Sequence, residues 1–257
     1  METRPAPWIS ALRHSHDLLR AAAEPLDAGQ LRRPSYDPGW SIAQVLSHLG
    51  SQAEIFGLFL NAGLSGQDPP GRDAFPPIWQ AWSERSPQAQ AADALHADKA
   101  VTERFESLDA GQLERLRLRL FGMDLDAAGL ARLRLSEHAV HTWDIAVALD
   151  PAATVAPDAV GLLIDTLGRL AARTAKPGGT RRRLQISTVS PVRHFTLDIG
   201  ESVTLAPAPS SEGLPELALP AEALVRLVYG RLDPAHTPPV EARRVDLDEL
   251  RPIFPGF

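Results

Sequence analysis

The spacing of apolar residues divides the chain into a helical first part and a mixed second part. Up to about residue 150, apolar side chains recur every three or four positions over long segments. This pattern predicts helices over 7–23, 42–61, 87–108 and 126–149. An up-down four-helix bundle is the simplest architecture for them, with functional side chains projecting inward from facing helices.

Three shorter segments of the first part are less regular. Residues 63–77 are rich in Gly, Pro and Asp and predict an irregular loop. Trp79 and Trp82 predict a short helical turn, whose side chains either pack on the bundle or line a substrate cleft. Residues 116–123 alternate basic and apolar side chains, which favours a strand or an extended loop crossing the bundle.

The composition changes after Asp150, where we place a domain boundary between 1–150 and 151–257. A helix over 157–174 and a flexible basic loop over 176–183 come first, and the loop is either solvated or attracts an anionic ligand. Apolar residues then alternate with a period of two, which predicts antiparallel strands. The expected elements are strands at 184–188, 195–199, 203–205, 216–219 and 240–245, and helices at 220–231 and 246–254. The second domain is therefore α+β.

One histidine stands at the edge of an apolar helix face. Ser41 and Gln44 form a capping box, so a helix begins at Ile42. His48 lies beside the apolar stripe of this helix and can point into the bundle interior. It is either a hydrogen-bonded core histidine or a metal ligand.

A second segment, Glu137-His138-Ala139-Val140-His141, places three potential metal ligands within five residues. On a helix, Glu137 and His141 share one face, one turn apart, and Asp144 can orient the imidazole of His141. A catalytic zinc takes three protein ligands and keeps one open position, so His48, Glu137 and His141 make a plausible set. The alternatives are a solvated helix face and a ligand pair of His138 and His141. The order and spacing differ from the zinc-protease pattern His-Glu-x-x-His.

Composition narrows the chemistry. The 257-residue chain contains no cysteine, which excludes disulfides, thiolate ligands and a cysteine nucleophile. Any sulfur used in a reaction must come from a small molecule. The net charge of -6 argues against a basic nucleic-acid surface, and no apolar run approaches the ~18 residues of a membrane span. The N-terminal sequence lacks the apolar core of a signal peptide, so we expect a cytoplasmic protein without nucleic-acid or membrane partners.

The chain resembles the mycothiol-dependent maleylpyruvate isomerase family, within the DinB-like metalloprotein superfamily. The resemblance rests on three motifs in order, and it extends over nearly the whole chain. They are Gly39-Trp40-Ser41 leading to His48-Leu49, Arg134 to Asp144 with its Glu-x-x-x-His-x-x-Asp pattern, and Leu224 to Arg231 with its Gly-Arg pair. The resemblance implies a DinB-like bundle followed by a smaller, sterol-carrier-like α+β domain.

The resemblance also implies a divalent metal, usually zinc, on His48, Glu137 and His141, and mycothiol as thiol cosubstrate. The thiolate would attack a small electrophile as an isomerase or an S-transferase, and Arg231 would hold the substrate carboxylate. Arg231 follows Gly230, and glycine commonly ends a helix. The alternative role for Arg231 is therefore that of a solvent-facing helix cap. The competing functions are a metal-dependent hydrolase and a non-catalytic protein that binds a metal or a small ligand.

Overall fold

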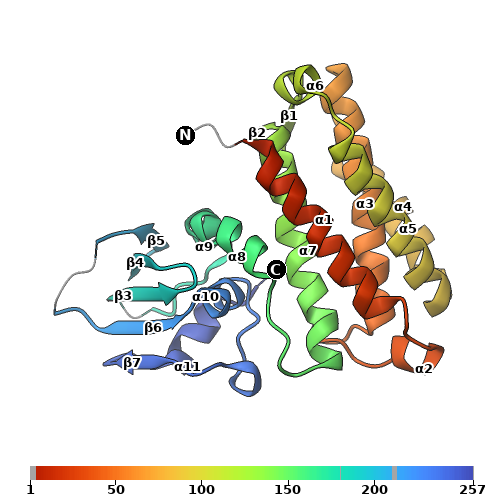
Figure 1. Ribbon diagram of the computed structural model, residues 1–257. Helices are drawn as coiled ribbons and strands as arrows, with labels where there is room; N and C mark the ends of the chain where they lie inside the picture. The colour runs from red at the N-terminus through yellow and green to blue at the C-terminus, as the bar shows by residue number, and fades with distance from the viewer. Residues whose placement is uncertain (1–3, 180, 210–212, 257) are drawn as a thin grey trace. The chain divides into compact units, whose positions relative to one another are not determined.

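The computed structural model describes residues 4–179, 181–209 and 213–256 (Figure 1). The chain divides into two compact units, of which the first ends at Thr154 and the second begins at Val155. This division lies just after Asp150, the position at which we propose the domain boundary. Each unit is described by itself below.

The first unit is a bundle of four long helices. They are α1 (Pro5–Ala23), α3 (Ile42–Ser65), α5 (Pro87–Glu106) and α7 (Ala127–Leu149). Both α1 and α3 pack along α5 and α7, so α1 and α3 occupy opposite corners of the bundle. The predicted helical bundle is confirmed.

A short helix sets the direction of the chain within the bundle. Helix α4 (Phe75–Ser83) runs back along α3: the Phe75 ring centroid lies 5.9 Å from that of Phe59, and Trp82 lies against Gly50. A Cβ atom at Gly50 would stand 2.2 Å from the Trp82 ring, so only glycine permits this approach. Because α4 returns the chain, α5 runs in the same direction as α3 (Figure 1). The long helices therefore do not alternate in direction along the chain, as the predicted up-down order would require. Helix α4 begins at Phe75, so the last residues of the segment predicted as an irregular loop, 75–77, are helical.

Several short elements complete the first unit. Strands β1 (Arg117–Leu120) and β2 (Met123–Asp126) form an antiparallel hairpin where the sequence left open a strand or an extended loop. Helices α2 (Ala28–Leu31) and α6 (Ala110–Arg115) were not predicted. Each nevertheless begins with a capping box of an aspartate and a glutamine three residues later, a signal visible in the sequence.

The second unit contains a five-stranded sheet in the order β5-β4-β3-β6-β7. Its strands are β3 (Arg182–Val189), β4 (Arg193–Ile199), β5 (Val203–Pro207), β6 (Glu216–Pro220) and β7 (Glu241–Arg243). All neighbouring pairs are antiparallel except β3 and β6. Strand β4 pairs with one edge of β3, and β6 pairs with the other edge. Because β6 runs parallel to β3, the sheet is mixed.

The helices of the second unit are shorter than predicted. The segment expected as one helix over 157–174 forms α8 (Pro157–Leu163), a 3-10 turn (Ile164–Thr166) and α9 (Leu167–Thr174). The Thr166 hydroxyl donates to the carbonyl oxygen of Leu163 at 2.7 Å, which competes with the helical bonding pattern there. The remaining elements are α10 (Ala221–Val228), the 3-10 turns Pro234–His236 and Arg251–Ile253, and α11 (Leu247–Leu250).

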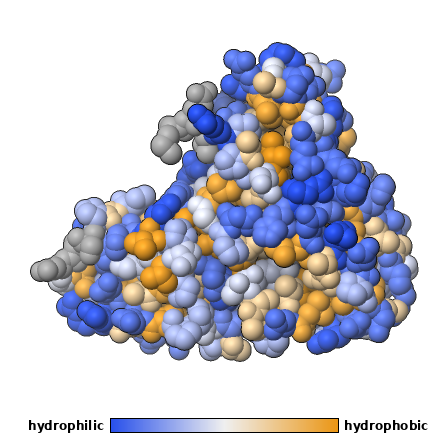
Figure 2. Space-filling view, in the orientation of Figure 1, coloured by the Kyte–Doolittle hydropathy of each residue, from blue (hydrophilic) through white to orange (hydrophobic). Residues whose placement is uncertain are grey.

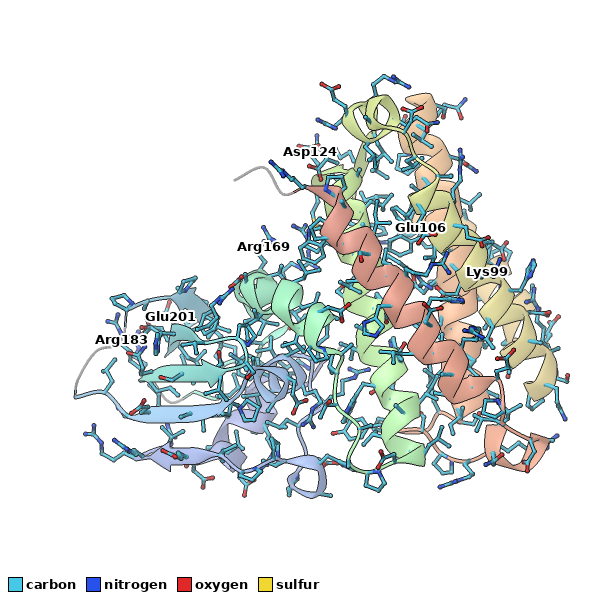
Figure 3. The ribbon with its side chains drawn as sticks, in the orientation of Figure 1. Lys99, Glu106, Asp124, Arg169, Arg183 and Glu201 are labelled. Carbon is cyan, nitrogen blue, oxygen red and sulfur yellow. The ribbon has the colours of Figure 1, made fainter. Side chains whose placement is uncertain are left out.

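The face drawn in Figure 2 is mostly hydrophilic, with hydrophobic residues in scattered patches. Lys99 and Glu106 on α5, labelled in Figure 3, are examples of the charged side chains at the surface. None of the helices in the described ranges combines the length and apolarity needed to cross a membrane.

A buried ionic network joins the helices of the bundle from inside. The carboxylate of Asp98 on α5 accepts hydrogen bonds from His16 Nδ1 on α1 at 2.7 Å and from His138 Nε2 on α7 at 2.8 Å. It also accepts from Arg134 Nη2 at 2.7 Å, and the same nitrogen donates to the carbonyl of Leu49 on α3 at 3.1 Å. Each of the four charged or titratable side chains is at most 2% exposed. One carboxylate therefore links all four long helices.

The charge state of this network follows from its partners. Burial alone would raise the pKa of Asp98, but His138, His16 and Arg134 hold it well below the ordinary carboxyl value. Burial is also the largest influence on His138 and lowers its pKa. The centre of the bundle therefore contains an ionised aspartate and a neutral His138. The neutral ring donates from Nε2 to Asp98 and accepts at Nδ1 from the Ser15 hydroxyl at 2.7 Å.

We expect Asp98→Asn to destabilise the protein by about 3–5 kcal/mol at pH 7, because an amide nitrogen cannot accept these bonds and Arg134 loses its buried counter-ion. Asp93→Asn is the matched control on the same helix. Asp93 pairs with Arg85 at 3.3 Å but is half exposed, so its loss should cost about 1 kcal/mol or less. Urea unfolding followed by circular dichroism measures both. Equal stability losses in the two variants would contradict the role of the network.

Candidate metal centre

Helix α3 supplies the first candidate ligand. The Ser41 hydroxyl accepts from Gln44 N at 3.3 Å and Gln44 Oε1 accepts from Ser41 N at 2.8 Å, which is the predicted capping box. The helix therefore starts at Ile42 and places His48 two turns in, beside fully buried apolar neighbours. The His48 side chain is 21% exposed.

Helix α7 supplies the other two candidates. Glu137 and His141 lie one turn apart on the side of α7 that faces His48. Glu137 Oε2 stands 3.6 Å from His48 Nε2 and 3.8 Å from His141 Nε2, and the two imidazole centroids are 4.7 Å apart. One ligand atom from each of the three residues lies within 4.8 Å of the others. The structure thus brings together the residues that the sequence pointed to.

The donor atoms fit a divalent ion. Two ligands of a tetrahedral zinc at about 2.0–2.1 Å stand about 3.4 Å apart, close to both Glu137–histidine distances. His48 Nε2 is buried and has no hydrogen-bond partner in the described structure, since 3.6 Å is too long for a hydrogen bond. A metal bond would satisfy this nitrogen. Two imidazoles and a carboxylate are a donor set that zinc accepts readily.

The protonation of His48 suits ligation. Burial is the main cause of a pKa lowered from the ordinary histidine value, His141 adds to it, and the Glu137 carboxylate opposes it. The neutral imidazole, which is the form that binds metal, is therefore favoured.

Asp144 fixes the orientation of His141. Its Oδ2 lies 2.8 Å from His141 Nδ1, and the carboxylate is fully buried. With Nδ1 donating to the Asp144 carboxylate oxygen, Nε2 presents its lone pair towards Glu137 and His48. Asp37, His141 and Asp144 form a second cluster that could hold an ion. This cluster would use Nδ1, the nitrogen that already bonds to Asp144, so we favour the cluster containing His48.

His138 is not part of either cluster. Its two ring nitrogens are engaged by Asp98 on one side and by Ser15 and Thr142 on the other, deep in the bundle. The geometry does not support the alternative pair of His138 and His141, because His138 points to Asp98 whereas His141 points to Glu137 and His48. The solvated helix face is also wrong, since His141 is only 8% exposed and His138 is fully buried.

Arg231 lies in the second unit. The structure buries it to 7% exposure, so it is not a solvent-facing cap. Gly230 adopts the left-handed φ of 73°, and Arg231 N donates to Arg226 O at 2.7 Å. Arg231 Nη1 donates to the carbonyl oxygen of Tyr229 at 2.9 Å. Its catalytic role stays a prediction.

Two features of the site were not foreseen. The 35–40 turn is tied to α7, because Tyr36 N donates to Asp144 O at 3.1 Å and the Tyr36 ring lies 4.7 Å from that of Trp143. This turn brings Asp37 within 4.0 Å of His141 Nδ1 and Trp40 within 5.4 Å, ring to ring, of His48. The hints in the sequence were the turn residues Asp37-Pro38-Gly39 and the Gly39-Trp40-Ser41 motif at the start of the capped helix.

Comparison with known proteins identifies the family. Residues 12–146 of the 257 match the sequence profile described as "Mycothiol maleylpyruvate isomerase N-terminal domain". The chain belongs to this family, and the resemblance inferred from its motifs is confirmed.

Solved structures show the same fold. The crystal structure of the mycothiol-dependent maleylpyruvate isomerase aligns with a TM-score of 0.68 over 93% of each chain, at 14% sequence identity. A variant of that enzyme gives the same TM-score at 13% identity. At this level of identity the likeness establishes the fold, a DinB-like bundle with a second α+β unit.

A third relative is closer in sequence over a shorter stretch. A protein of Geobacillus thermodenitrificans (strain NG80-2), named "Putative metal-dependent hydrolase", is 38% identical over 87 residues. The match covers 34% of this chain and 44% of the relative, so this chain spans less than half of the length of that protein.

We expect His48→Ala and His141→Ala each to abolish stoichiometric metal binding, since either change leaves two ligands. His138→Ala should retain one ion per folded chain although it lowers stability, because His138 faces Asp98 rather than the cluster. Metal analysis after dialysis against zinc, with circular dichroism to score folding, measures this. Full metal retention by His48→Ala or His141→Ala would contradict the assignment of that histidine as a metal ligand.

Proposed function

We propose that this protein is a divalent-metal-dependent enzyme that uses a low-molecular-weight thiol, mycothiol, as the nucleophile on a small, carboxylate-bearing electrophile. The reaction class is isomerisation or S-transfer. The observation that carries the proposal is the His48, Glu137 and His141 cluster in a chain that belongs to the mycothiol maleylpyruvate isomerase family.

The charge of the cluster supports thiol chemistry. Two neutral imidazoles and one carboxylate carry a single negative charge, so a bound divalent ion, with zinc preferred, keeps a net positive charge. Such an ion would lower the pKa of a thiol at its open position and so supply a thiolate near neutral pH. Since the chain has no cysteine, the sulfur comes from a cosubstrate.

The chain's own residues provide orientation. Asp144 fixes the tautomer of His141, and burial keeps His48 neutral. Arg231 is the residue we assign to the substrate carboxylate, because a guanidinium binds a carboxylate with two parallel hydrogen bonds. After addition of the thiol to an enoate double bond, rotation and loss of the thiol would give isomerisation. Retention of the carbon–sulfur bond would give transfer.

A metal-dependent hydrolase is the second candidate. The relative from Geobacillus thermodenitrificans, whose name states this activity, is 38% identical over 87 residues. The same three ligands would then serve to activate water rather than a thiol.

Cobalt(II)-loaded protein distinguishes the two candidates. We expect mycothiol to produce a near-ultraviolet thiolate-to-cobalt absorption band with a stoichiometry of one, and turnover of maleylpyruvate to require both metal and thiol. His48→Ala should show neither. A protein without the band that hydrolyses esters or amides in a metal-dependent, thiol-independent way would establish the hydrolase instead.

We expect Arg231→Lys to lower turnover about 10–100-fold without loss of metal. The lysine ammonium cannot form the two parallel hydrogen bonds that a planar guanidinium makes to a carboxylate. Arg231 is buried, so the change should also lower stability. Arg226→Lys is the matched control: Arg226 is 3% exposed and pairs with Glu222 in the same helix. This control should lose stability while keeping activity at a temperature where both variants are folded. Wild-type turnover in Arg231→Lys would contradict the assignment of Arg231 to the substrate carboxylate.

A further inference from the structure

Residues 251–256 cross the Gly230-Arg231 pair inside the second unit. A Cβ atom at Gly230 would stand 2.5 Å from the backbone nitrogen of Gly256 and 2.7 Å from the carbonyl carbon of Pro255. No side chain can occupy that space, so two stretches of backbone lie in direct contact here. Gly230 is therefore needed for more than its left-handed φ of 73° just after α10, because it also leaves room for the crossing segment.

The crossing segment is anchored just before the contact. Arg251 Nε donates to the carbonyl oxygen of Leu232 at 2.6 Å, close to the Gly-Arg pair in sequence. The side chain of Phe254 is 2% exposed and so belongs to the core of this unit. Segments without such anchors fray, whereas this one is tied down on both the polar and the apolar side. The anchors therefore hold Gly256 in a defined place over Gly230.

Gly256 also lies against the side chain of Arg231. Arg231 Nη1 donates to the carbonyl oxygen of Tyr229 at 2.9 Å. A Cβ atom at Gly256 would stand 2.8 Å from that oxygen and 3.3 Å from the donating nitrogen. The segment thus covers both ends of one hydrogen bond. Because a guanidinium is planar, holding one of its nitrogens against a fixed carbonyl restricts the directions in which its other N–H groups point.

We propose that residues 251–256 act as a clamp that positions Arg231, with Gly256 as the positioning residue in contact with it. The clamp orients the guanidinium before the substrate arrives, so that binding a carboxylate costs little further loss of side-chain freedom. Gly230 admits the clamp, and Gly256 holds the arginine. The contacts stand by themselves, whereas the carboxylate as the ligand of Arg231 rests on the proposed function.

The first experiment observes the Arg231 guanidinium directly and needs neither metal nor substrate. A held guanidinium rotates slowly about its Cζ–Nη bonds and gives resolved Nη signals in the NMR spectrum of protein labelled with 15N-arginine. The Arg231 signals are assigned by their loss in Arg231→Lys, and we expect them to disappear in Gly256→Ala. The Arg226 signals should persist as evidence of folding, since Glu222 holds this arginine with bonds of 2.7 and 2.8 Å.

Gly179→Ala is the matched control. Gly179 has a φ of 79°, against 80° for Gly256, but a Cβ atom there would meet nothing within 4 Å. Both changes place an alanine in the left-handed region, and only Gly256→Ala adds a clash at Arg231. Arg231 signals that survive in Gly256→Ala, or that vanish equally in Gly179→Ala, would overturn the proposal.

A second variant covers the case in which Gly256→Ala loses the Arg226 signals as well and so fails to fold. Arg251→Leu removes the anchor on Leu232 without adding atoms at the crossing. It should give the same selective loss of the Arg231 signals. Unchanged Arg231 signals in Arg251→Leu would overturn the clamp.

The second experiment measures the consequence for turnover of maleylpyruvate by zinc-loaded protein with mycothiol. Gly256→Ala should lower kcat/KM about tenfold, the effect of one weakened charged hydrogen bond, and Gly179→Ala should leave it unchanged. The double variant of Gly256→Ala and Arg231→Lys should be no slower than Arg231→Lys alone, because the clamp acts only through the arginine. Additive losses would overturn the positioning role. If the wild-type protein shows no thiol-dependent turnover, the proposed function fails and the NMR comparison alone decides the clamp.

Discussion

The bundle depends on one buried carboxylate. Asp98 is 1% exposed, and its three partners come from α1 and α7, while Arg134 extends the connection to the backbone of α3. Charges buried in this way are stable only when every partner is in place, so the helices cannot slide or rotate independently. The network therefore determines the rotation of α7 about its axis. Whatever α7 presents on its other faces is fixed at the same time.

The candidate metal centre is the consequence. Arg134, His138 and Thr142 follow one another at intervals of four and form the ridge that faces the network. Glu137, His141 and Asp144 form the adjacent ridge, which the same rotation directs towards α3. The bond from Arg134 to Leu49 O holds α3 at the residue that follows His48. The three candidate ligands thus meet because a different set of residues holds their helices together.

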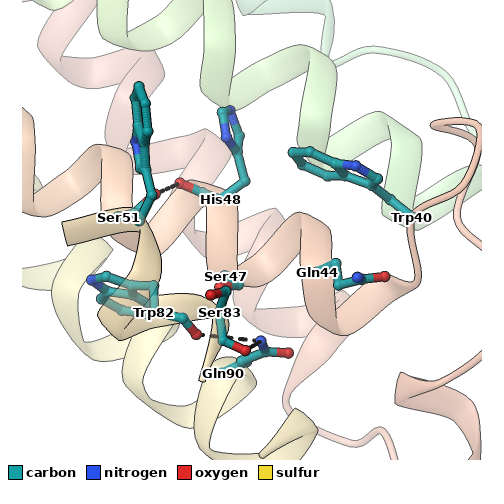
Figure 4. A pocket seen from close by; sticks show the side chains of 9 residues that line it. Trp40, Gln44, Ser47, His48, Ser51, Trp82, Ser83 and Gln90 are labelled. Atoms are coloured by element: carbon teal, nitrogen blue, oxygen red, sulfur yellow. Dashed lines mark hydrogen bonds between the residues drawn. The ribbon is translucent and has the colours of Figure 1, made fainter. Parts of the chain in front are cut away.

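Local signals in the sequence predicted much of this arrangement. The capping box at Ser41, the ligand spacing of Glu137 and His141, and the change of period near residue 184 each depend on neighbours a few residues apart. The remaining features of the fold and of the site depend on contacts between residues that are far apart in the sequence. Nothing near Asp98 distinguishes it from the exposed Asp93 on the same helix, because its burial comes from α1 and α7. The parallel pairing of β3 with β6 and the return of α4 along α3 are likewise set by packing. A pocket of about 380 Å³ beside His48, drawn in Figure 4, is lined by residues of the 40–51 stretch, α4 and α5. Of these, only Trp79 and Trp82 were recognised as possible cleft residues.

The most direct test of the central claim is the position of the metal itself. Crystals of zinc-loaded protein, with anomalous diffraction recorded at the zinc edge, locate the ion without reference to activity. The account predicts one peak about 2.0–2.2 Å from His48 Nε2, His141 Nε2 and a Glu137 oxygen, with His141 Nδ1 still bonded to Asp144. A peak at His141 Nδ1 between Asp37 and Asp144, or at His138, would contradict it.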